Sequence, residues 1–305
     1  MSPTLAHYAE YAAVRTMLGA VGALSWEGAG ALGARLGRLA YRPLGIRRGV
    51  VERQIAAAFP AWSTADVRRT ARAAYEHLGR SSVEAALLPS LGPARVLDLF
   101  DGAEGWEVIE EALAAGRGLI VATGHLGNWE LAGAYFAARG VPTDAIARRM
   151  ANPLFDRYLT ETRSRLGMAV VHDADAVRRT PRSLREGRVV AFLADQGVLG
   201  LASTFVPFFG RPAKTPRGPA VFALRLGVPV AFGVALRQPS GKYRMLLESI
   251  PVESTGDRVR DTDAIVAAYT AALERRVRQA PEQYFWHHRR WRRQPPGTPP
   301  ELREP

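Results

Sequence analysis

A histidine and a glutamate lie five residues apart at the end of an apolar run, and together these residue types can do acid–base chemistry. The run from Gly118 to Thr123 is predicted to form a strand, which leads into the glycine-flanked His125 and then a helix. If that helix starts just after His125, the carboxylate of Glu130 can return to the imidazole. A carboxylate on one ring nitrogen fixes the tautomer and leaves the other nitrogen free to take a proton. Such a pair is a general base that needs a nucleophile from the substrate, most simply a hydroxyl.

The same loop offers backbone donors for a developing oxyanion. The amides of Gly124, Gly127 and Asn128 precede an expected helix, where N–H groups lack partners within the helix. Asn128 is therefore also a candidate substrate-binding residue. The alternative is a histidine that only packs after a strand, because the spacing H-x-x-x-x-E is common by itself.

Four further polar residues are candidates for binding substrate. Arg148 and Arg163 could each hold a phosphate in the bidentate manner of arginine, with surface ion pairing as the alternative. Asp195 and Gln196 lie at the end of another predicted strand. Ligands of open α/β sheets gather at the carboxyl ends of strands, so we expect these two residues beside the histidine.

Short β-branched runs alternate with amphipathic helices from about residue 104 onward, whereas the first hundred residues are predicted to be helical. This order predicts an α/β fold with a mostly parallel central sheet flanked by helices and a helical N-terminal portion. Ser63 and Asp66 have the spacing of a helix cap, and that helix is expected to run towards Leu88. Candidate strands are Gly118–Thr123, Val170–His172, Arg188–Asp195, Val228–Leu236 and Tyr243–Ser249. Candidate helices are 104–115, 128–139, 153–166, 174–186, 215–226 and 261–279.

The 305-residue chain carries a net charge of +12, and of its 41 basic residues all but Lys214 and Lys242 are arginine. The excess predicts attraction to an anionic partner such as a phospholipid surface. There is no cysteine, which excludes disulfides, a thiolate nucleophile and cysteine zinc sites.

Three segments are predicted along the chain. Residues 1–41 are rich in alanine, leucine and glycine, and we expect a helical segment that associates with membranes without a run long enough to span one. A buried helix pair is the alternative for this segment. Residues 42–293 are predicted to form the catalytic α/β domain, and the proline-rich residues 294–305 a disordered tail.

Three other patterns have simpler explanations. Gly28, Gly30 and Gly33 match the dinucleotide fingerprint, but no strand precedes them, so close helix packing suffices. Phe208-Phe209 could line an acyl channel, although core packing explains the pair as well. The aromatic and basic cluster 286–293 is typical of nucleic-acid binders and also of a lipid headgroup interface.

Several motifs together resemble a known family. The HLGNWE stretch that ends at Glu130 is similar to the H-x4-E motif of the lysophospholipid acyltransferase superfamily. The chain more closely resembles the late acyltransferases of lipid A biosynthesis and the related phosphatidylinositol mannoside acyltransferases. The resemblance spans roughly residues 40–293 and also rests on Arg48–Pro60, Arg148–Pro153 (RRMANP), Arg163–Gly167, Asp195–Gly197, Val206–Ala213 (VPFFGRPA) and Pro281–Trp291.

This resemblance implies an O-acyltransferase at the cytoplasmic face of the plasma (inner) membrane, bound peripherally or through its N-terminus. The co-substrate would be a fatty acyl thioester on acyl carrier protein or coenzyme A, and the acceptor a hydroxyl of a glycolipid or lipid A precursor. His125 would act as general base and Glu130 would orient it, and neither a metal nor another cofactor would be needed. Glutamate at 130 fits the lipid A branch better, since the mannoside enzymes usually carry aspartate, whereas the N-terminal anchor is weaker here than in the lipid A enzymes.

Two other classes of function compete with acyl transfer. A lipid thioesterase or hydrolase would use water in place of the acceptor hydroxyl. A basic nucleic-acid-binding protein would need no catalysis, but the basic residues are spread over the chain and no known binding motif occurs, so we expect no nucleic-acid partner. The sequence leaves open the acyl chain length, the hydroxyl that is acylated, the acyl carrier and the oligomeric state.

Overall fold

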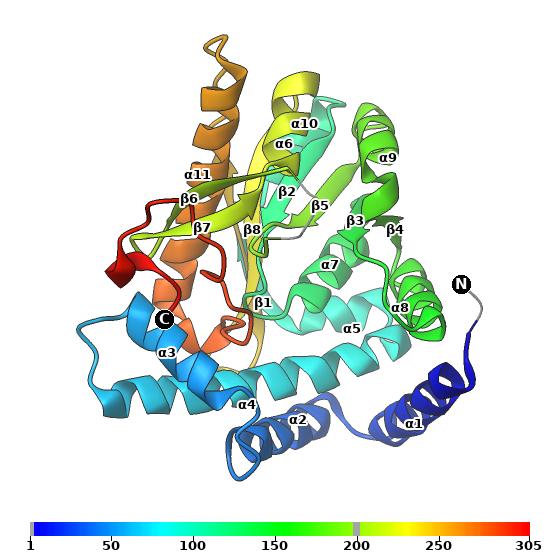
Figure 1. Ribbon diagram of the computed structural model, residues 1–305. Coiled ribbons are helices and arrows are strands. Elements are labelled where there is room, and N and C mark those ends of the chain that lie inside the picture. Colours follow the sequence, from blue (N-terminus) through cyan, green and yellow to red (C-terminus); the bar gives the residue numbers. More distant parts are fainter. Residues whose placement is uncertain (1–2, 198–201) are drawn as a thin grey trace.

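A seven-stranded, mostly parallel sheet forms the centre of the molecule in the computed structural model, which describes residues 3–197 and 202–305 (Figure 1). The strand order is β1-β9-β8-β2-β5-β3-β4, and within this sheet only the β8–β9 pair is antiparallel. Strands β6 and β7 form a separate antiparallel hairpin. The strands are β1 Phe100–Glu104, β2 Leu119–Thr123, β3 Thr143–Ala147, β4 Met168–His172, β5 Val189–Leu193, β6 Ser203–Phe208, β7 Arg211–Pro216, β8 Val230–Arg237 and β9 Tyr243–Ile250.

Helices cover both faces of the sheet and build the N-terminal portion (Figure 1). They are α1 Leu5–Val21, α2 Trp26–Tyr41, α3 Arg48–Ala58, α4 Thr64–Leu87, α5 Pro93–Asp98, α6 Glu107–Ala114, α7 Trp129–Ala138, α8 Pro153–Arg165, α9 Asp173–Arg185, α10 Gly218–Leu226 and α11 Arg258–Gln279. Short 3-10 turns are η1 Leu88–Ser90, η2 Pro281–Gln283 and η3 Pro300–Leu302. The α/β fold with a helical N-terminal portion is therefore confirmed.

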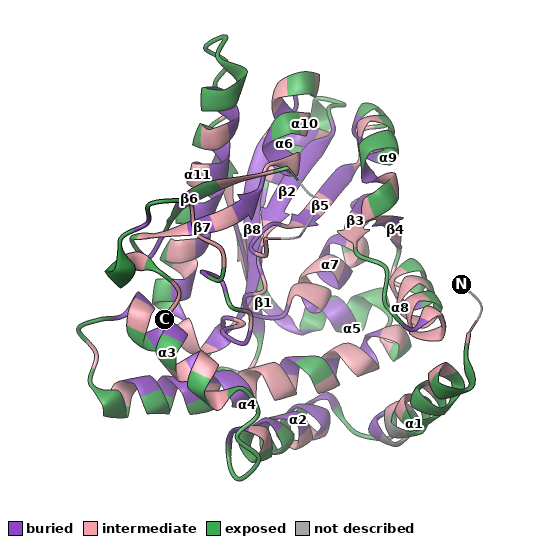
Figure 2. Ribbon diagram, viewed as in Figure 1, coloured by how far each residue is buried: buried purple, intermediate pink, exposed green. Residues whose placement is uncertain are grey.

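Burial explains why the central strands are so apolar. Strands β2 and β8 are buried along nearly their whole length (Figure 2). Their side chains enter two apolar clusters, one on each face of the sheet. Parallel strands covered on both faces read as continuous apolar runs rather than as alternating ones. All five predicted strands and all six predicted helices occur, with ends shifted by a few residues.

Each of the four strands that the sequence did not predict contains polar, glycine or proline residues that interrupt its apolar character. Strand β3 has the sequence TDAIA, and its Asp144 is buried because Arg188 and Ser183 hydrogen-bond the carboxylate. Strand β1 contains a glycine and two acidic residues. The hairpin strands β6 and β7 contain proline, which is rare in central strands.

Helix α2 packs on α4 through glycines. A Cβ atom on Gly33 would collide with the backbone of Gly79, and one on Gly37 with the backbone of Tyr75. The glycine pattern of α2 thus serves close helix packing, as the sequence predicted. Ser63 caps α4 by accepting a hydrogen bond from the amide of Asp66, which is also as predicted.

The N-terminal segment places apolar side chains at the surface. Leu5, Leu36 and Leu39 are exposed, and Figure 2 shows exposed residues along both α1 and α2. In the described ranges, no helix has both the length and the apolar character that crossing a membrane requires. The C-terminal residues 294–305 include the turn η3, and Arg211 donates a hydrogen bond of 2.8 Å to the carbonyl of Arg303. Disorder of this tail stays a prediction.

Candidate active site

Three adjacent parallel strands deliver the candidate residues to one edge of the sheet. His125 follows β2, Asp195 and Gln196 follow β5, and Arg148 follows β3. Because β2, β5 and β3 are neighbours with parallel register, their carboxyl ends lie side by side. Asp195 and Gln196 thus lie at the same strand edge as His125, where the sequence predicted them, and Arg148 joins them from a strand that was not predicted.

Asp195 holds His125 at two points. The Nδ1 atom of His125 lies 2.7 Å from one carboxylate oxygen of Asp195, and the backbone amide of His125 donates to the other oxygen at 2.9 Å. Since the carboxylate is an acceptor, Nδ1 carries the proton that it shares with Asp195, and Nε2 keeps its lone pair. The Gln196 side-chain amide lies 3.2 Å from the same Nδ1 atom. This arrangement leaves Nε2 of His125 able to accept a proton.

The electrostatics of the pair favour a protonated imidazole. Burial lowers the pKa of His125, but the charge and hydrogen bond of Asp195 outweigh burial, so the pKa lies above its ordinary value. The charge of Glu130 raises it further. Burial raises the pKa of Asp195, yet the contacts with His125 prevail and lower it to about 2. The carboxylate of Asp195 thus stabilises the imidazolium that forms when His125 accepts a proton.

The hydrogen-bond partner of His125 differs from the expected one. Glu130 lies in the first turn of α7 and binds Arg163 of α8 through two hydrogen bonds, of 2.5 and 3.1 Å. The helix begins only at Trp129, so the residues between His125 and Glu130 do not follow helical spacing. The expected hydrogen bond between Glu130 and the ring is therefore absent, and Asp195, seventy residues away in the sequence, makes it instead. A catalytic role of Glu130 stays a prediction.

Two of the three expected oxyanion donors already have partners. The amide of Gly127 donates to the carbonyl of Gln283 and the amide of Asn128 to the carbonyl of Ala235, each at 3.0 Å. The expectation for these two amides was wrong, because a strand and the C-terminal segment use them to hold the loop. The side chain of Asn128 is buried and caps α7 by accepting from the amide of Leu131.

The remaining predicted residues differ in whether their side chains reach solvent or the cavity. Arg148 is exposed, and no ion pair is found for it among the residues that the structure describes. Gln196 and Arg163 line the cavity described below, although Arg163 is engaged with Glu130. Asp195 is only 3% exposed, does not line that cavity and hydrogen-bonds His125, so the structure places it behind the histidine. Its contact with substrate stays a prediction.

Helix α4 contributes residues that the sequence analysis missed. The Nε2 atom of His77 lies 3.1 Å from the carbonyl oxygen of Gly127, and burial lowers the pKa of His77 to about 4, so the ring is neutral near pH 7. Glu84 accepts from Asn128 at 3.4 Å and from Tyr243 at 2.6 Å, and it also pairs with Arg237. Positions 77 and 84 share one face of a helix. The carboxylate of Glu84 on the buried face of that helix was the sequence feature that could have indicated these contacts.

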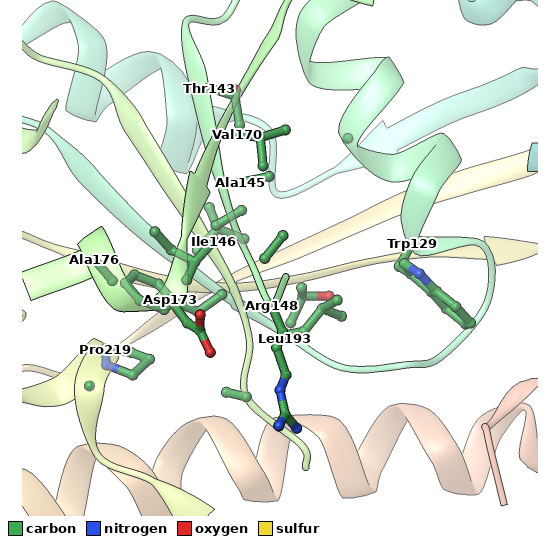
Figure 3. A pocket seen from close by; sticks show the side chains of 18 of the residues that line it. Trp129, Thr143, Ala145, Ile146, Arg148, Val170, Asp173, Ala176, Leu193 and Pro219 are labelled. Atoms are coloured by element: carbon green, nitrogen blue, oxygen red, sulfur yellow. The ribbon is translucent and has the colours of Figure 1, made fainter. Parts of the chain in front are cut away.

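A cavity of about 640 Å³ opens beside His125 and extends along the sheet. Its wall is mainly apolar, and Figure 3 shows Ala145 and Val170 of the neighbouring strands β3 and β4, with Trp129 at the start of α7 across from them. Polar lining residues include His125, Glu130, Arg148, Arg163 and Gln196. An apolar cavity with a few convergent polar groups is the usual form of a small-molecule site.

The aromatic residues near the C-terminus belong to the core. Trp286 and Trp291 are buried almost completely, and Arg290 is 4% exposed, so this part of the predicted headgroup or nucleic-acid surface does not face solvent. Trp286 lies in one aromatic cluster with Phe208 and Phe209. The core explanation of the phenylalanine pair is therefore the correct one.

Comparison with known proteins decides the family. A sequence model of the bacterial lipid A biosynthesis acyltransferases matches residues 2–293. The chain belongs to this family. It is therefore an O-acyltransferase, and the positions of the match include every candidate residue named above.

Individual relatives come from both branches that the motifs resemble. The acyltransferase is 28% identical over 88% of its length to a lipid A biosynthesis lauroyltransferase of Escherichia coli K12, of which 86% is covered. A palmitoleoyltransferase of the same organism is also 28% identical, with 87% of this chain and 85% of that one covered. A phosphatidylinositol mannoside acyltransferase of Mycobacterium tuberculosis is 34% identical over 51% of this chain and 50% of its own.

Proposed function

We propose that this acyltransferase moves a fatty acyl group from an acyl thioester to a hydroxyl of a membrane glycolipid, with His125 as the general base. The observation that carries the proposal is the placement of His125, held by Asp195 at Nδ1, at the mouth of a long apolar cavity. The names of the relatives support a lipid A precursor or a phosphatidylinositol mannoside as the acceptor.

The reaction follows from the residues at the mouth. The acceptor hydroxyl gives its proton to Nε2 of His125 while its oxygen attacks the thioester carbonyl carbon. The tetrahedral intermediate then collapses, the carbon–sulfur bond breaks, and the imidazolium returns the proton to the leaving thiolate. Asp195 stabilises the imidazolium between these steps. Glu130 adds negative charge near the ring without bonding it.

Substrate binding divides between the apolar wall and the basic mouth. The acyl chain of the thioester lies along the apolar wall of the cavity, where removing it from water is favourable. Arg148 stands exposed at the mouth, where its guanidinium can meet a phosphate of the donor carrier or of the acceptor. The donor is an acyl carrier protein or coenzyme A thioester.

The same proposal places the protein at the cytoplasmic face of the inner membrane. Exposed apolar residues of the N-terminal helices and the net charge of +12 support peripheral binding to an anionic surface.

The test compares His125→Ala with His172→Ala, because both histidines line the cavity but only His125 contacts Asp195. With acyl thioesters of both carriers and extracted glycolipids, mass spectrometry of the products should show a loss of about 10²–10⁴-fold for His125→Ala. The melting temperature of each preparation is measured alongside. A stable His125→Ala protein that transfers acyl groups at the wild-type rate would refute the mechanism. Free fatty acid as the main product would instead indicate a hydrolase.

A further inference from the structure

A second apolar cavity, of about 390 Å³, lies between α1, the C-terminal half of α4 and α8. Its apolar lining includes Val14 and Leu18 of α1, Ala85 of α4, and Phe155 of α8. Figure 1 shows α1 and α8 beside one another at the end of α4. Protein interiors are closely packed, and unfilled spaces larger than a water molecule are few. An apolar hollow within the size range of ligand sites therefore calls for an occupant.

The two cavities meet beside the catalytic histidine. Four residues line both of them, namely Trp129, Glu130, Leu159 and Arg163. Glu130 and Arg163 form the two-bond ion pair described above, and the Trp129 ring packs edge-on against His125 with 4.9 Å between ring centroids. The second cavity thus ends one layer of side chains away from His125.

Helix α1 closes the second cavity through specific contacts. Asn152, the N-cap of α8, donates to the carbonyl of His7 and to the carboxylate of Glu10, and the guanidinium of Arg15 lies 4.8 Å from the Tyr158 ring centroid. The wall that closes the cavity thus belongs to the helix that carries exposed apolar residues such as Leu5. A lipid chain arriving from a membrane on that side meets this cavity first.

We propose that this second cavity binds an alkyl chain of the acceptor lipid while the first cavity holds the acyl chain of the donor. The inference rests on the proposed function, because a transferase that acylates a lipid must bring two apolar chains to one histidine. The shared wall meets that requirement: the chains lie in separate cavities, and their polar ends meet at His125. A single cavity would force donor and acceptor to compete.

The experiment narrows each cavity separately. Ala85→Phe fills the second cavity, and Ala145→Phe is the matched control because Ala145 is a similarly half-buried alanine that lines only the first cavity. The probes are dodecyl maltoside below its micelle concentration, as an alkyl chain on a sugar, and dodecanoyl-coenzyme A. Binding of each probe is measured by titration calorimetry, and the near-ultraviolet circular dichroism of each variant reports its packing.

Ala85→Phe should weaken binding of dodecyl maltoside by about tenfold or more, since excluding even two methylenes has that effect. It should leave dodecanoyl-coenzyme A binding unchanged, and Ala145→Phe should show the reverse pattern. If Ala85→Phe disturbs packing, the smaller Ala86→Leu provides the same comparison, because Ala86 lines the same cavity. Displacement of one probe by the other, or unchanged maltoside binding in a folded Ala85→Phe or Ala86→Leu protein, would overturn the proposal. A wild-type protein that binds both probes independently but transfers no acyl group would refute the proposed function and leave the second site standing.

Discussion

At the scale of single residues, the site depends on one carboxylate, that of Asp195, which fixes both the position and the proton affinity of His125. In the proposed mechanism, His125 can accept a proton only when it is neutral. Because its pKa lies above the ordinary value of about 6.5, activity should fall as the pH drops through a midpoint above that value. Asp195→Asn should move the midpoint to lower pH and reduce the plateau rate by about 10²–10⁴-fold, since the imidazolium loses its counter-charge. A pH profile of kcat/KM for both proteins measures this, and an unmoved midpoint would contradict it.

The same pair has a defined effect on stability. A raised histidine pKa stabilises the folded state fully below about pH 6.5, and this contribution fades as the pH rises through the folded pKa. The lowered pKa of Asp195 contributes above about pH 3.9 and is lost as the pH falls towards about 2. The melting-temperature difference between wild type and Asp195→Asn should therefore be largest near pH 5 and smaller at pH 9.

Glu130 and Arg163 should behave as one unit. Their ion pair is mostly buried, with side-chain exposures of 26% and 19%, so Glu130→Gln leaves the guanidinium without its partner and Arg163→Lys loses the two-bond geometry. In a double-mutant cycle on kcat/KM we expect the two losses to be non-additive by about 0.5–3 kcal/mol. Arg165→Lys is the control, since Arg165 is an exposed residue of the same helix. Fully additive losses would mean that Arg163 binds substrate independently of Glu130.

Spacing along the chain predicted His125 but could not predict its partner. The histidine was identifiable because a strand, two glycines and a helix start surround it locally. Asp195 becomes its partner only because β5 pairs with β2, a contact that no short motif encodes. The contact expected between Glu130 and His125 is absent for the converse reason, since proximity in the sequence suggested a contact that the start of α7 prevents.

At the scale of elements, helix α4 holds the loop that follows β2 through the contact of Glu84 with Asn128. Glu84→Gln would leave Arg237 buried without a counter-charge, and such losses cost about 3–5 kcal/mol. It would also weaken the hold on Asn128, so kcat should fall by more than the unfolded fraction explains. Glu76→Gln is the control, because Glu76 makes surface ion pairs on the same helix, where about 0–1 kcal/mol is expected. Urea unfolding and steady-state kinetics measure both effects, and equal behaviour of the two variants would contradict this role.

The predicted and missed elements differ in one physical property. Buried parallel strands such as β2 and β5 can be recognised in the sequence as apolar runs. Strand β3 cannot, because it contains Asp144, which is buried through its ion pair with Arg188. The glycines of α2 were correctly assigned to packing because they follow a helical rather than a strand pattern. Contacts between distant elements, such as Glu84 with Arg237, were beyond any local pattern.

At the scale of the whole molecule, charge and exposed apolar residues should together attach the protein to anionic vesicles. We expect binding at low salt that weakens as ionic strength rises, because charges are screened within about 8 Å at physiological ionic strength. Leu39→Ser on α2 should reduce binding, whereas Val259→Ser should not, since Val259 is comparably exposed, 60% against 51%, but lies on α11. Vesicle sedimentation measures the bound fraction. These substitutions are preferable to deleting residues 1–41, since α2 is packed into α4.

Residues 283–285, near the C-terminus, complete the hydrogen bonds of the loop that carries His125. The amide of Phe285 donates to the carbonyl of His125, and the carbonyl of Gln283 accepts from the amide of Gly127. A chain emerges from the ribosome N-terminus first, so His125 is translated long before the residues that complete its hydrogen bonds. Ribosome-bound and prematurely terminated chains that lack these residues therefore carry an unfinished catalytic loop. The hydrogen bonds that hold the His125 loop can therefore form only after residues 283–285 have been synthesised.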